Sequence, residues 1–259
     1  MAIVVTTELV KELRDKTGIS VMQCRKALEE AEGDMNKALA ILKKSSSDIA
    51  LKKADREVKD GAVMVKGSGD TLALVTLLCE TDFVSKNEDF VNLLTQLADK
   101  ALKDGVDGLA LSAKELIDGV IQKTGENIQL GESYLVKGSV LGSYVHNNKK
   151  AVIVSLEGGN MEIAKDVAMH VAAMHPEFIS KDDIKEEDKK TMTEVFSKEV
   201  ENVDKPQEIK QKILQGKIDT YFKEKTLLSQ PFIKNPDETI ESLLNKAGAK
   251  IKEIKQYSI

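Results

Sequence analysis

Apolar positions in the first part of the chain recur at helical spacing and predict a bundle of three short helices. Gly18 and Gly33 are suited to end the first two helices, because glycine readily adopts the left-handed conformation found after helix ends. Ser20 and Asp34 are suitable N-caps for the second and third helices. We therefore expect residues 1–45 to form a small three-helix domain.

The segment Ser45-Ser46-Ser47-Asp48 interrupts this helical pattern. Serine and aspartate compete with helices by bonding to nearby backbone groups, which makes a break at this point the simplest interpretation. The Lys- and Ala-rich stretch that follows has helical character again. We expect residues 46–60 to form a separate linker helix.

From residue 61 the apolar period changes from 3.6 to 2. Two alternating runs, 62–65 and 72–78, flank a glycine-bearing turn and predict a β-hairpin. An amphipathic helix follows and should end at Gly105. A further helix is predicted at 112–122.

A second set of the same elements follows. Residues 134–146 and 151–156 are expected to form another hairpin, with Asn147 and Asn148 in its turn, since Asn tolerates positive φ. A helix comes next. The order of strand, strand, corner and helix thus occurs twice, which predicts an α+β core of two subdomains with antiparallel sheets.

Residues 181–226 carry charges of both signs and two narrow apolar stripes that Pro206 separates. Such a pattern is typical of an antiparallel helical hairpin protruding from a core. Beyond it, residues 230–233 and 251–257 are expected to be extended and to return to the second sheet, with a helix at 239–246 between them. The expected domains are therefore residues 1–45, a linker helix 46–60, a first core subdomain 61–133, a second core subdomain 134–180 plus 227–259, and the hairpin module 181–226.

Composition and charge narrow the function classes. The chain has 259 residues, 41% hydrophobic and 31% charged, as in a soluble globular protein, and its net charge of −5 argues against a stand-alone nucleic-acid binder. No apolar run is long enough to span a membrane, and the N-terminus lacks the basic region of a signal peptide. Cys24 and Cys79 lie far apart, which favours a reducing, cytoplasmic compartment.

Cofactor and metal motifs are not found in the sequence. No phosphate-binding loop of the Walker type occurs, so we expect no nucleotide bound by the chain itself. None of His146, His170 and His175 has a His or Cys neighbour at zinc spacing. We expect no metal and no cofactor, and a packed structural role for His170.

One corner of the chain is unusual for its aromatic residue. Thr81, Asp82, Phe83 and Val84 lie between the first hairpin and the long helix, in a chain with six Phe, four Tyr and no Trp. Phe83 could fold back into the core or could reach outward from a loop, where binding residues concentrate. The matching corner of the second half, residues 157–160, has no aromatic, which favours an outward role.

Cys79 could in principle act as a nucleophile with His146 as its base. A small buried residue at the end of a strand is the better interpretation of Cys79. Met22 could likewise belong to a contact surface or to the core of the N-terminal bundle.

Several short motifs are spread across nearly the whole chain, namely Leu13-Arg14-Asp15-Lys16-Thr17-Gly18, Cys24-Arg25-Lys26-Ala27-Leu28, Gly33-Asp34, Thr81-Asp82-Phe83-Val84, Gly125-Glu126-Asn127-Ile128, Gly142-Ser143-Tyr144-Val145-His146, Met169-His170-Val171-Ala172-Ala173, Pro176-Glu177-Phe178 and Gln230-Pro231-Phe232. Together, and in this order, they resemble one family, the bacterial translation elongation factor Ts. The resemblance implies a guanine-nucleotide exchange factor for elongation factor Tu, with no active-site chemistry of its own. A scaffold that holds a partner without driving exchange remains an alternative.

The resemblance also implies roles for individual segments. Residues 1–45 look like the family's ubiquitin-associated-like domain, which contacts the GTPase domain of the partner. The segment 181–226 looks like the family's coiled-coil module, which suggests a possible homodimer. The partner-binding residues implied are Leu13, Arg14, Val21, Met22 and His146, and the segment implied to dislodge Mg²⁺ from the partner is Thr81, Asp82, Phe83 and Val84.

Overall fold

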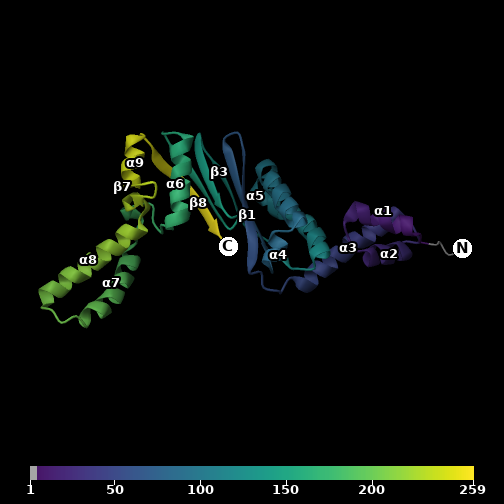
Figure 1. Cartoon of the computed structure of the whole chain (residues 1–259), viewed down its shortest axis with the longest axis horizontal. Coiled ribbons are helices and arrows are strands. Elements are labelled where there is room, and N and C mark those ends of the chain that lie inside the picture. The colour runs from purple at the N-terminus through teal and green to yellow at the C-terminus, as the bar shows by residue number, and fades with distance from the viewer. Residues whose placement is uncertain (1–4) are drawn as a thin grey trace. The chain divides into compact units, whose positions relative to one another are not determined.

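The computed structural model describes residues 5–259, apart from the side chain of Leu111, and these residues divide into two units. The first unit comprises the chain up to Val136 together with Val145–Ala151 and Tyr257–Ile259, and the second comprises Lys137–Tyr144 and Val152–Gln256. Figure 1 shows their helices and strands. The N-terminal segment that is not expected to be a signal peptide begins with residues 1–4. These four residues lie outside the described residues.

The three predicted N-terminal helices are present. They are α1 (Thr7–Thr17), α2 (Val21–Glu30) and α3 (Met35–Lys53). Gly18 ends α1 in the left-handed conformation with φ 70°, and the side chains of Ser20 and Asp34 accept hydrogen bonds from the first turns of α2 and α3. Leu13 and Leu28 are fully buried in the core of this bundle.

The predicted break at residues 45–48 is wrong, because α3 continues through it to Lys53. Ser46 is buried and its hydroxyl donates to the carbonyl of Lys43, which keeps this side chain inside the helix. The hydroxyl of Ser47 donates to Asp118 at 2.8 Å. Packing of α3 against a neighbouring helix therefore overrides the weak helix preference of serine.

The first predicted hairpin is confirmed and belongs to a three-stranded sheet. Strands β1 (Asp60–Ser68), β2 (Thr71–Cys79) and β3 (Ile128–Lys137) follow the order β1-β2-β3. β1 and β2 pair antiparallel, with Asp60 opposite Cys79 and Ser68 opposite Thr71. The extended segment expected to begin at residue 134 begins earlier, at Ile128, and joins this sheet rather than a hairpin with the following strand.

Two helices follow β2, the one-turn α4 (Asp82–Ser85) and the long α5 (Glu88–Thr124), which packs on β1 and β2 (Figure 1). Gly105 interrupts α5, as the sequence predicts, with non-helical φ 79° and ψ 172°. Helical structure resumes directly after Gly105 instead of at residue 112. Phe90 and Leu94 are buried and pack in the same core as Leu77 of β2.

The second unit repeats the pattern of a small sheet covered by a helix. Strands β4 (Val140–His146), β5 (Lys150–Glu157) and β8 (Lys250–Ser258) have the order β4-β5-β8, and α6 (Met161–Met174) packs against them. The turn between β4 and β5 places Asn147 and Asn148 at positive φ, 50° and 56°, as expected. Each half is thus α+β, with a β-hairpin that leads into a helix.

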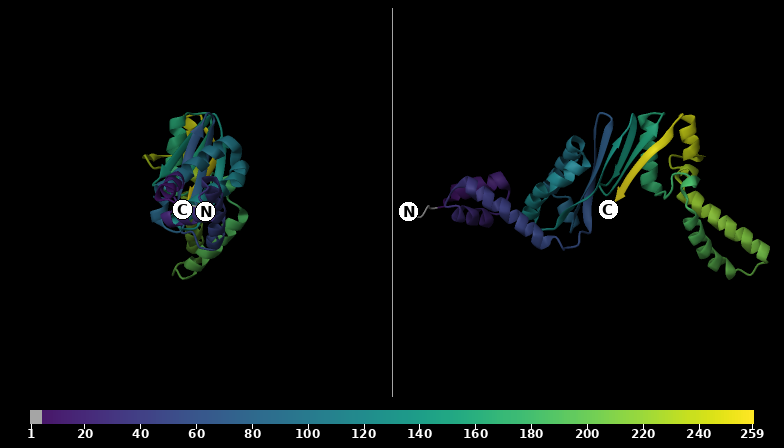
Figure 2. Two further views of the ribbon diagram at one scale, coloured as in Figure 1. Left: turned by 90° about the vertical axis from the view of Figure 1, so that its right-hand side faces the viewer. Right: turned by 180° about the vertical axis from the view of Figure 1, so that it is seen from behind.

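Two long helices occupy most of the segment 181–226. They are α7 (Glu186–Glu201) and α8 (Gln207–Lys225), which lie side by side (Figure 2). The rings of Phe196 and Tyr221 pack edge to face with their centroids 5.8 Å apart. Nζ of Lys217 forms an ion pair with Oε2 of Glu199 at 2.7 Å. Short segments η1 (Lys181–Asp183) and η2 (Leu227–Ser229) flank them. Self-association through this segment stays a prediction.

The remaining elements of the second unit are β6 (Pro231–Phe232), β7 (Asn235–Thr239) and α9 (Ile240–Lys246). The expected helix at 239–246 and the return of the C-terminal strand to the second sheet are both confirmed. Residues 230–233 differ from expectation, because Pro231 and Phe232 pair with β7 in a separate two-stranded ribbon. Gly248 follows α9 at φ 61°.

His170 has the structural role that the sequence predicts. Its ring is fully buried on α6, where Nδ1 accepts a hydrogen bond from the backbone N–H of Ile233 at 3.2 Å. Nε2 therefore carries the proton and donates to Oε1 of Gln230 at 2.9 Å. The imidazole thus joins α6 to the β6 segment in its neutral form.

The buried, neutral His170 predicts that the folded protein loses stability in acid. Burial lowers the pKa of His170 below its ordinary value of 6.5, although the hydrogen bond to Gln230 opposes the shift. Because the unfolded chain then binds the proton more readily, stability is fully present above pH 6.5 and falls as the pH drops below it. We expect urea denaturation to show this loss in the wild type and most of it to be absent in His170→Gln. The slopes of the free energy of unfolding against pH should differ by at most about 1.4 kcal/mol per pH unit. His146→Gln, which removes an exposed imidazole, is the control; equal pH dependence in all three proteins would contradict the prediction.

Candidate functional site

The corner between β2 and α5 presents an aromatic ring to solvent. Phe83 is 84% exposed, whereas its neighbour Val84 is 8% exposed and packs in the core with Phe90. Successive helical residues point about 100° apart, so the single turn of α4 can bury Val84 while Asp82 and Phe83 face outward. The interpretation of Phe83 as part of the core is therefore wrong.

Local bonds within the corner are few. The N–H of Ser85 donates to the carbonyl of Thr81 at 3.2 Å, and Asp82 pairs with Lys86 at 2.7 Å. This hydrogen-bonded ion pair raises the pKa of Lys86. Because an isolated helix of one turn is unstable in water, α4 depends on contacts with the rest of the fold.

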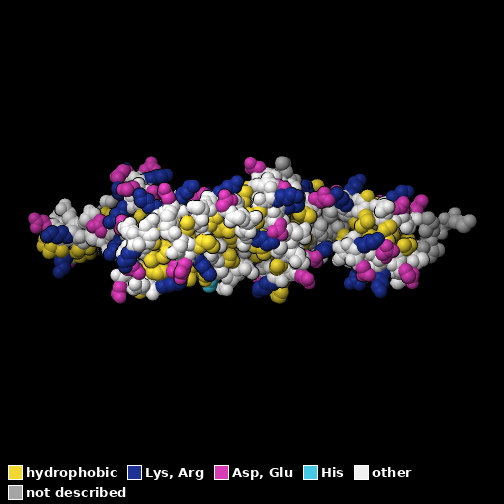
Figure 3. Space-filling view, turned by 90° about the horizontal axis from the view of Figure 1, so that it is seen from above, with side chains coloured by type: hydrophobic (Ala, Val, Ile, Leu, Met, Phe, Trp, Pro, Cys, Tyr) yellow, Lys and Arg dark blue, Asp and Glu magenta, His cyan; other side chains and the backbone are white. Residues whose placement is uncertain are grey.

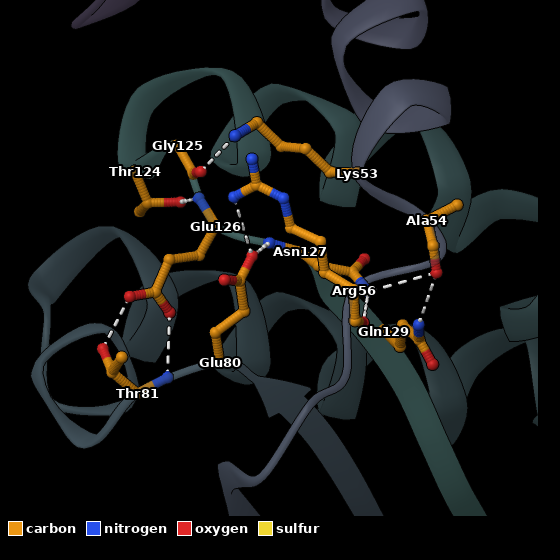
Figure 4. A network of polar contacts seen from close by, with 10 residues as sticks. All are labelled: Lys53, Ala54, Arg56, Glu80, Thr81, Thr124, Gly125, Glu126, Asn127 and Gln129. Carbon is orange, nitrogen blue, oxygen red and sulfur yellow. Dashed lines mark hydrogen bonds and ion pairs between the residues drawn. The ribbon is translucent and has the colours of Figure 1, made fainter.

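Glu126 supplies the main polar contact to the corner. Its Oε1 accepts from the hydroxyl of Thr81 at 2.6 Å, and its Oε2 accepts from the backbone N–H of Thr81 at 3.0 Å (Figure 4). One carboxylate therefore accepts hydrogen bonds from both donors of the residue directly before α4. Charge-assisted hydrogen bonds of this kind are stronger than neutral ones and fix orientation as well as distance.

A second layer of bonds holds the segment that carries Glu126. The N–H of Asn127 donates to Glu80 at 2.6 Å, and its side-chain amide donates to the carbonyls of Arg56 and Ala54 at 2.6 and 3.3 Å. Lys53, the last residue of α3, donates to the carbonyl of Gly125 (Figure 4). The corner is thus linked through residues 125–127 to the end of the helix that begins in the N-terminal bundle.

A third contact supports the corner from β1. Lys149 donates to the carboxylate of Asp60 and to the carbonyl of Gly61, both at 2.6 Å. Burial alone would raise the pKa of Asp60, but hydrogen bonds, the largest from Lys149, outweigh it and lower that pKa. Asp60 lies opposite Cys79 in the β1–β2 pair, so its ionised carboxylate ties the end of the sheet next to the corner to the turn that follows β4.

His146 lies at the beginning of that turn. Its side chain is exposed, with Nε2 3.3 Å from the side-chain amide nitrogen of Asn147. The turn is fixed to β1 by a hydrogen bond from the N–H of Val63 to the carbonyl of Asn148 at 2.8 Å. His146 and the Thr81–Val84 corner therefore both adjoin the same end of the first unit's sheet, near Asp60.

The proposed contact residues of the N-terminal bundle separate into exposed and buried ones. Arg14 and Val21 are exposed and Met22 is 81% exposed, whereas Leu13 is fully buried between the helices. Hydrophobic side chains are visible at the surface over the N-terminal helices in Figure 3. Leu13 thus packs beneath the exposed residues and cannot contact a partner unless the bundle opens. In the same way, Val84 is buried beneath the exposed Phe83.

The candidate nucleophile Cys79 is not activated. Its thiol is buried at the end of β2 and donates to the carbonyl of Thr81 at 3.2 Å. Burial, together with the nearby carboxylates of Asp60 and Glu126, raises the pKa of Cys79 to about 12. The thiolate required for nucleophilic attack is therefore not formed at neutral pH.

The described residues, 5–259, hold no group of three or more His, Cys, Asp or Glu side chains placed to bind a metal ion. None of the helices in this part of the chain is long and apolar enough to cross a membrane.

Comparison with known proteins identifies the family. The sequence model of the family Elongation factor TS matches residues 80–259, a stretch that includes the corner and Glu126. The chain belongs to the elongation factor Ts family. Elongation factor Ts of Hahella chejuensis is 40% identical over 98% of this chain and 92% of its own length. Those of Cellvibrio japonicus and Thioalkalivibrio sulfidiphilus are 39% and 37% identical, each over 98% of this chain and over 90% and 92% of their own lengths.

Membership of the elongation factor Ts family places the chain among the translation elongation factors of protein biosynthesis. The motif Gly125 to Ile128 is visible in the sequence and contributes to the family resemblance. The residues that Glu126 and Asn127 contact could not be predicted from it. A carboxylate directly after a glycine helix stop was the available signal. Its partner, Thr81, is 45 residues away in the sequence, and only the fold brings the two together.

Proposed function

We propose that this chain is a guanine-nucleotide exchange factor that binds elongation factor Tu with GDP and accelerates GDP release. The observation that carries the proposal is Phe83, a large apolar ring held 84% exposed on an anchored helical turn. Single exposed apolar side chains are common on soluble proteins, but Phe83 is the most exposed large hydrophobic side chain among the described residues, and Glu126 anchors the residue before its helical turn. A hydrophobic cavity in another protein is the natural partner for this side chain.

The mechanism acts through the metal of the partner. Bound GDP is neutralised by a phosphate-binding loop and Mg²⁺, and displacement of Mg²⁺ leaves the phosphate charge poorly balanced. Phe83 enters the partner as a wedge and, with Asp82 beside it, shifts the groups that hold the metal. GDP then leaves, and GTP takes its place.

The energies limit what the wedge can do alone. A shift of the partner from a GDP-holding to an open state, from 1:99 to 99:1, requires about 5.5 kcal/mol of differential binding. Burial of one Phe supplies roughly 1.5–3 kcal/mol. At least about 2.5 kcal/mol must therefore come from other contacts.

The N-terminal bundle provides one such contact. Arg14, Val21 and Met22 are exposed on it, and Met is well suited to protein interfaces because its side chain adapts to irregular surfaces. His146 and its turn provide a further contact at the end of the first sheet. Coupling between nucleotide and exchange factor is reciprocal, so a newly bound nucleotide weakens the complex and releases the factor.

Release of fluorescent GDP from elongation factor Tu tests this function directly. We expect the release rate to rise with the concentration of this chain and to saturate, and added Mg²⁺ to reduce the acceleration because it opposes metal displacement. A stable complex with an unchanged release rate would contradict the proposal and would favour a scaffold. Binding should be measured in the same samples, so that absence of a complex is distinguished from absence of exchange.

A further inference from the structure

Thr81 is the N-cap residue directly before α4, yet its side chain makes no capping hydrogen bond to the helix. Both of its donors are turned toward Glu126, which accepts the hydroxyl at 2.6 Å and the N–H at 3.0 Å. We infer that Glu126 is a positioning residue for nucleotide exchange, because its grip on Thr81 sets the direction in which α4 presents Phe83. This inference rests on the proposed function and adds to it a residue that need not touch the partner.

The geometry around Thr81 supports a directional role. The residue adopts an extended conformation, φ −133° and ψ 158°, directly before the helical turn that begins at Asp82. Its carbonyl is held as well, since it accepts from Ser85 N–H at 3.2 Å and from the thiol of Cys79 at 3.2 Å. With its N–H, carbonyl and hydroxyl all bonded, Thr81 has little freedom to rotate, and Phe83 follows two residues later.

Other contacts fix the depth of α4 but not its orientation. Val84 and Ser85 are buried beneath the turn, so they keep α4 against the core. Both of these side chains lie in the second half of the turn. The hydrogen bonds from Thr81 to Glu126 act at its other end, and we expect them to fix the direction in which the turn points.

The position of Glu126 also connects the wedge to the bundle. Its neighbours Gly125 and Asn127 bond to Lys53, Ala54 and Arg56 at the end of α3. Glu126 is therefore fixed relative to the helix that carries the bundle's core. A rigid link between two contact surfaces lowers the entropy lost when both engage one partner.

Variants of Glu126 in the full-length chain test the inference. We expect Glu126→Ala to lower kcat for GDP exchange on elongation factor Tu by about fivefold, the effect of one typical hydrogen bond, with KM nearly unchanged. Glu126→Gln keeps one acceptor and should recover part of the rate. Glu126→Asp keeps the charge but shortens the side chain, and should behave like Glu126→Ala. Glu253→Gln, which removes a half-buried carboxylate paired with Lys255 on β8, is the matched control.

Two further measurements separate positioning from a general loss of structure. Amide hydrogen exchange at Thr81 should accelerate in Glu126→Ala while urea denaturation stays close to that of the wild type. In a double-mutant cycle, Glu126→Ala should have no further effect once Phe83 is replaced by Ala. If Glu126→Ala proves poorly folded, Glu126→Gln supplies the same cycle.

The possible outcomes are distinct. Full exchange activity of Glu126→Ala alongside a slow Phe83→Ala would overturn the positioning role and leave the proposed function intact. Independent, multiplying effects of the two substitutions would also overturn it, since Glu126 would then act without Phe83. An unchanged rate in Phe83→Ala itself would remove the wedge, and the inference about Glu126 with it, even if the chain accelerates GDP release.

Discussion

Under the proposed function, Phe83→Ala is expected to slow the release of GDP from elongation factor Tu by about 10- to 150-fold, as follows from roughly 1.5–3 kcal/mol for the burial of one Phe. The ring is 84% exposed in the free protein, so nearly all of its apolar surface is available for burial in the complex. The loss should fall mainly on kcat, because the proposed contacts of the N-terminal bundle are unchanged in this variant. Stopped-flow release of fluorescent GDP at several concentrations of the chain measures both kcat and KM.

The stability of the variant should hardly change. An exposed ring contributes little to the folded state, and we expect the free energy of unfolding to stay within about 0.5 kcal/mol of the wild type. Met161→Ala is the matched control, since Met161 is also a large exposed apolar residue, 68% exposed, but lies at the start of α6 in the second unit. Phe83→Leu should retain part of the rate. Equal release by Phe83→Ala and Met161→Ala would count against the wedge.

Most secondary structure elements could be predicted because local signals and tertiary contacts agree. Gly18 and Gly105 adopt the positive φ that their glycine identity permits, and the Asn147-Asn148 turn does the same. The continuous helix α3 could not be predicted, since serine alone favours a break. The bond from Ser47 to Asp118, 71 residues away, shows that a non-local contact decides the local structure there.

The position of the candidate site could be predicted from the sequence, but the residues that hold it in place could not. An aromatic residue at a corner is visible in the sequence, and its missing counterpart in the second half indicates that packing alone does not require it. The buried positions of Leu13 and Val84 were not visible, because sequence motifs do not separate a contact residue from the residue that supports it. The role of Glu126 depends on the end of α5 meeting the end of β2, which local pattern does not encode.

Gly142→Ala should strongly destabilise the second unit. Gly142 is buried on β4, and a Cβ atom added there would overlap the backbone of Ala164 and Lys165 in α6. Helix backbone cannot move aside as a flexible side chain can, so either β4 or α6 must shift and loosen the core that they share. We expect a loss of about 3 kcal/mol or more in the free energy of unfolding, at the upper end of overpacking effects. Urea denaturation followed by circular dichroism measures the change.

Gly216→Ala is the same chemical change, but here we expect it to raise the free energy of unfolding. Gly216 lies exposed in α8, and an added Cβ meets no atom within 4 Å. Alanine there lowers the entropy of the unfolded chain and favours the helix, so we expect a gain of about 0.4–1 kcal/mol. A Gly142→Ala protein as stable as the Gly216→Ala protein would mean that α6 does not approach β4 as closely as the structure shows. Opposite signs for the two variants would show that close backbone contact, rather than glycine flexibility, requires glycine at position 142.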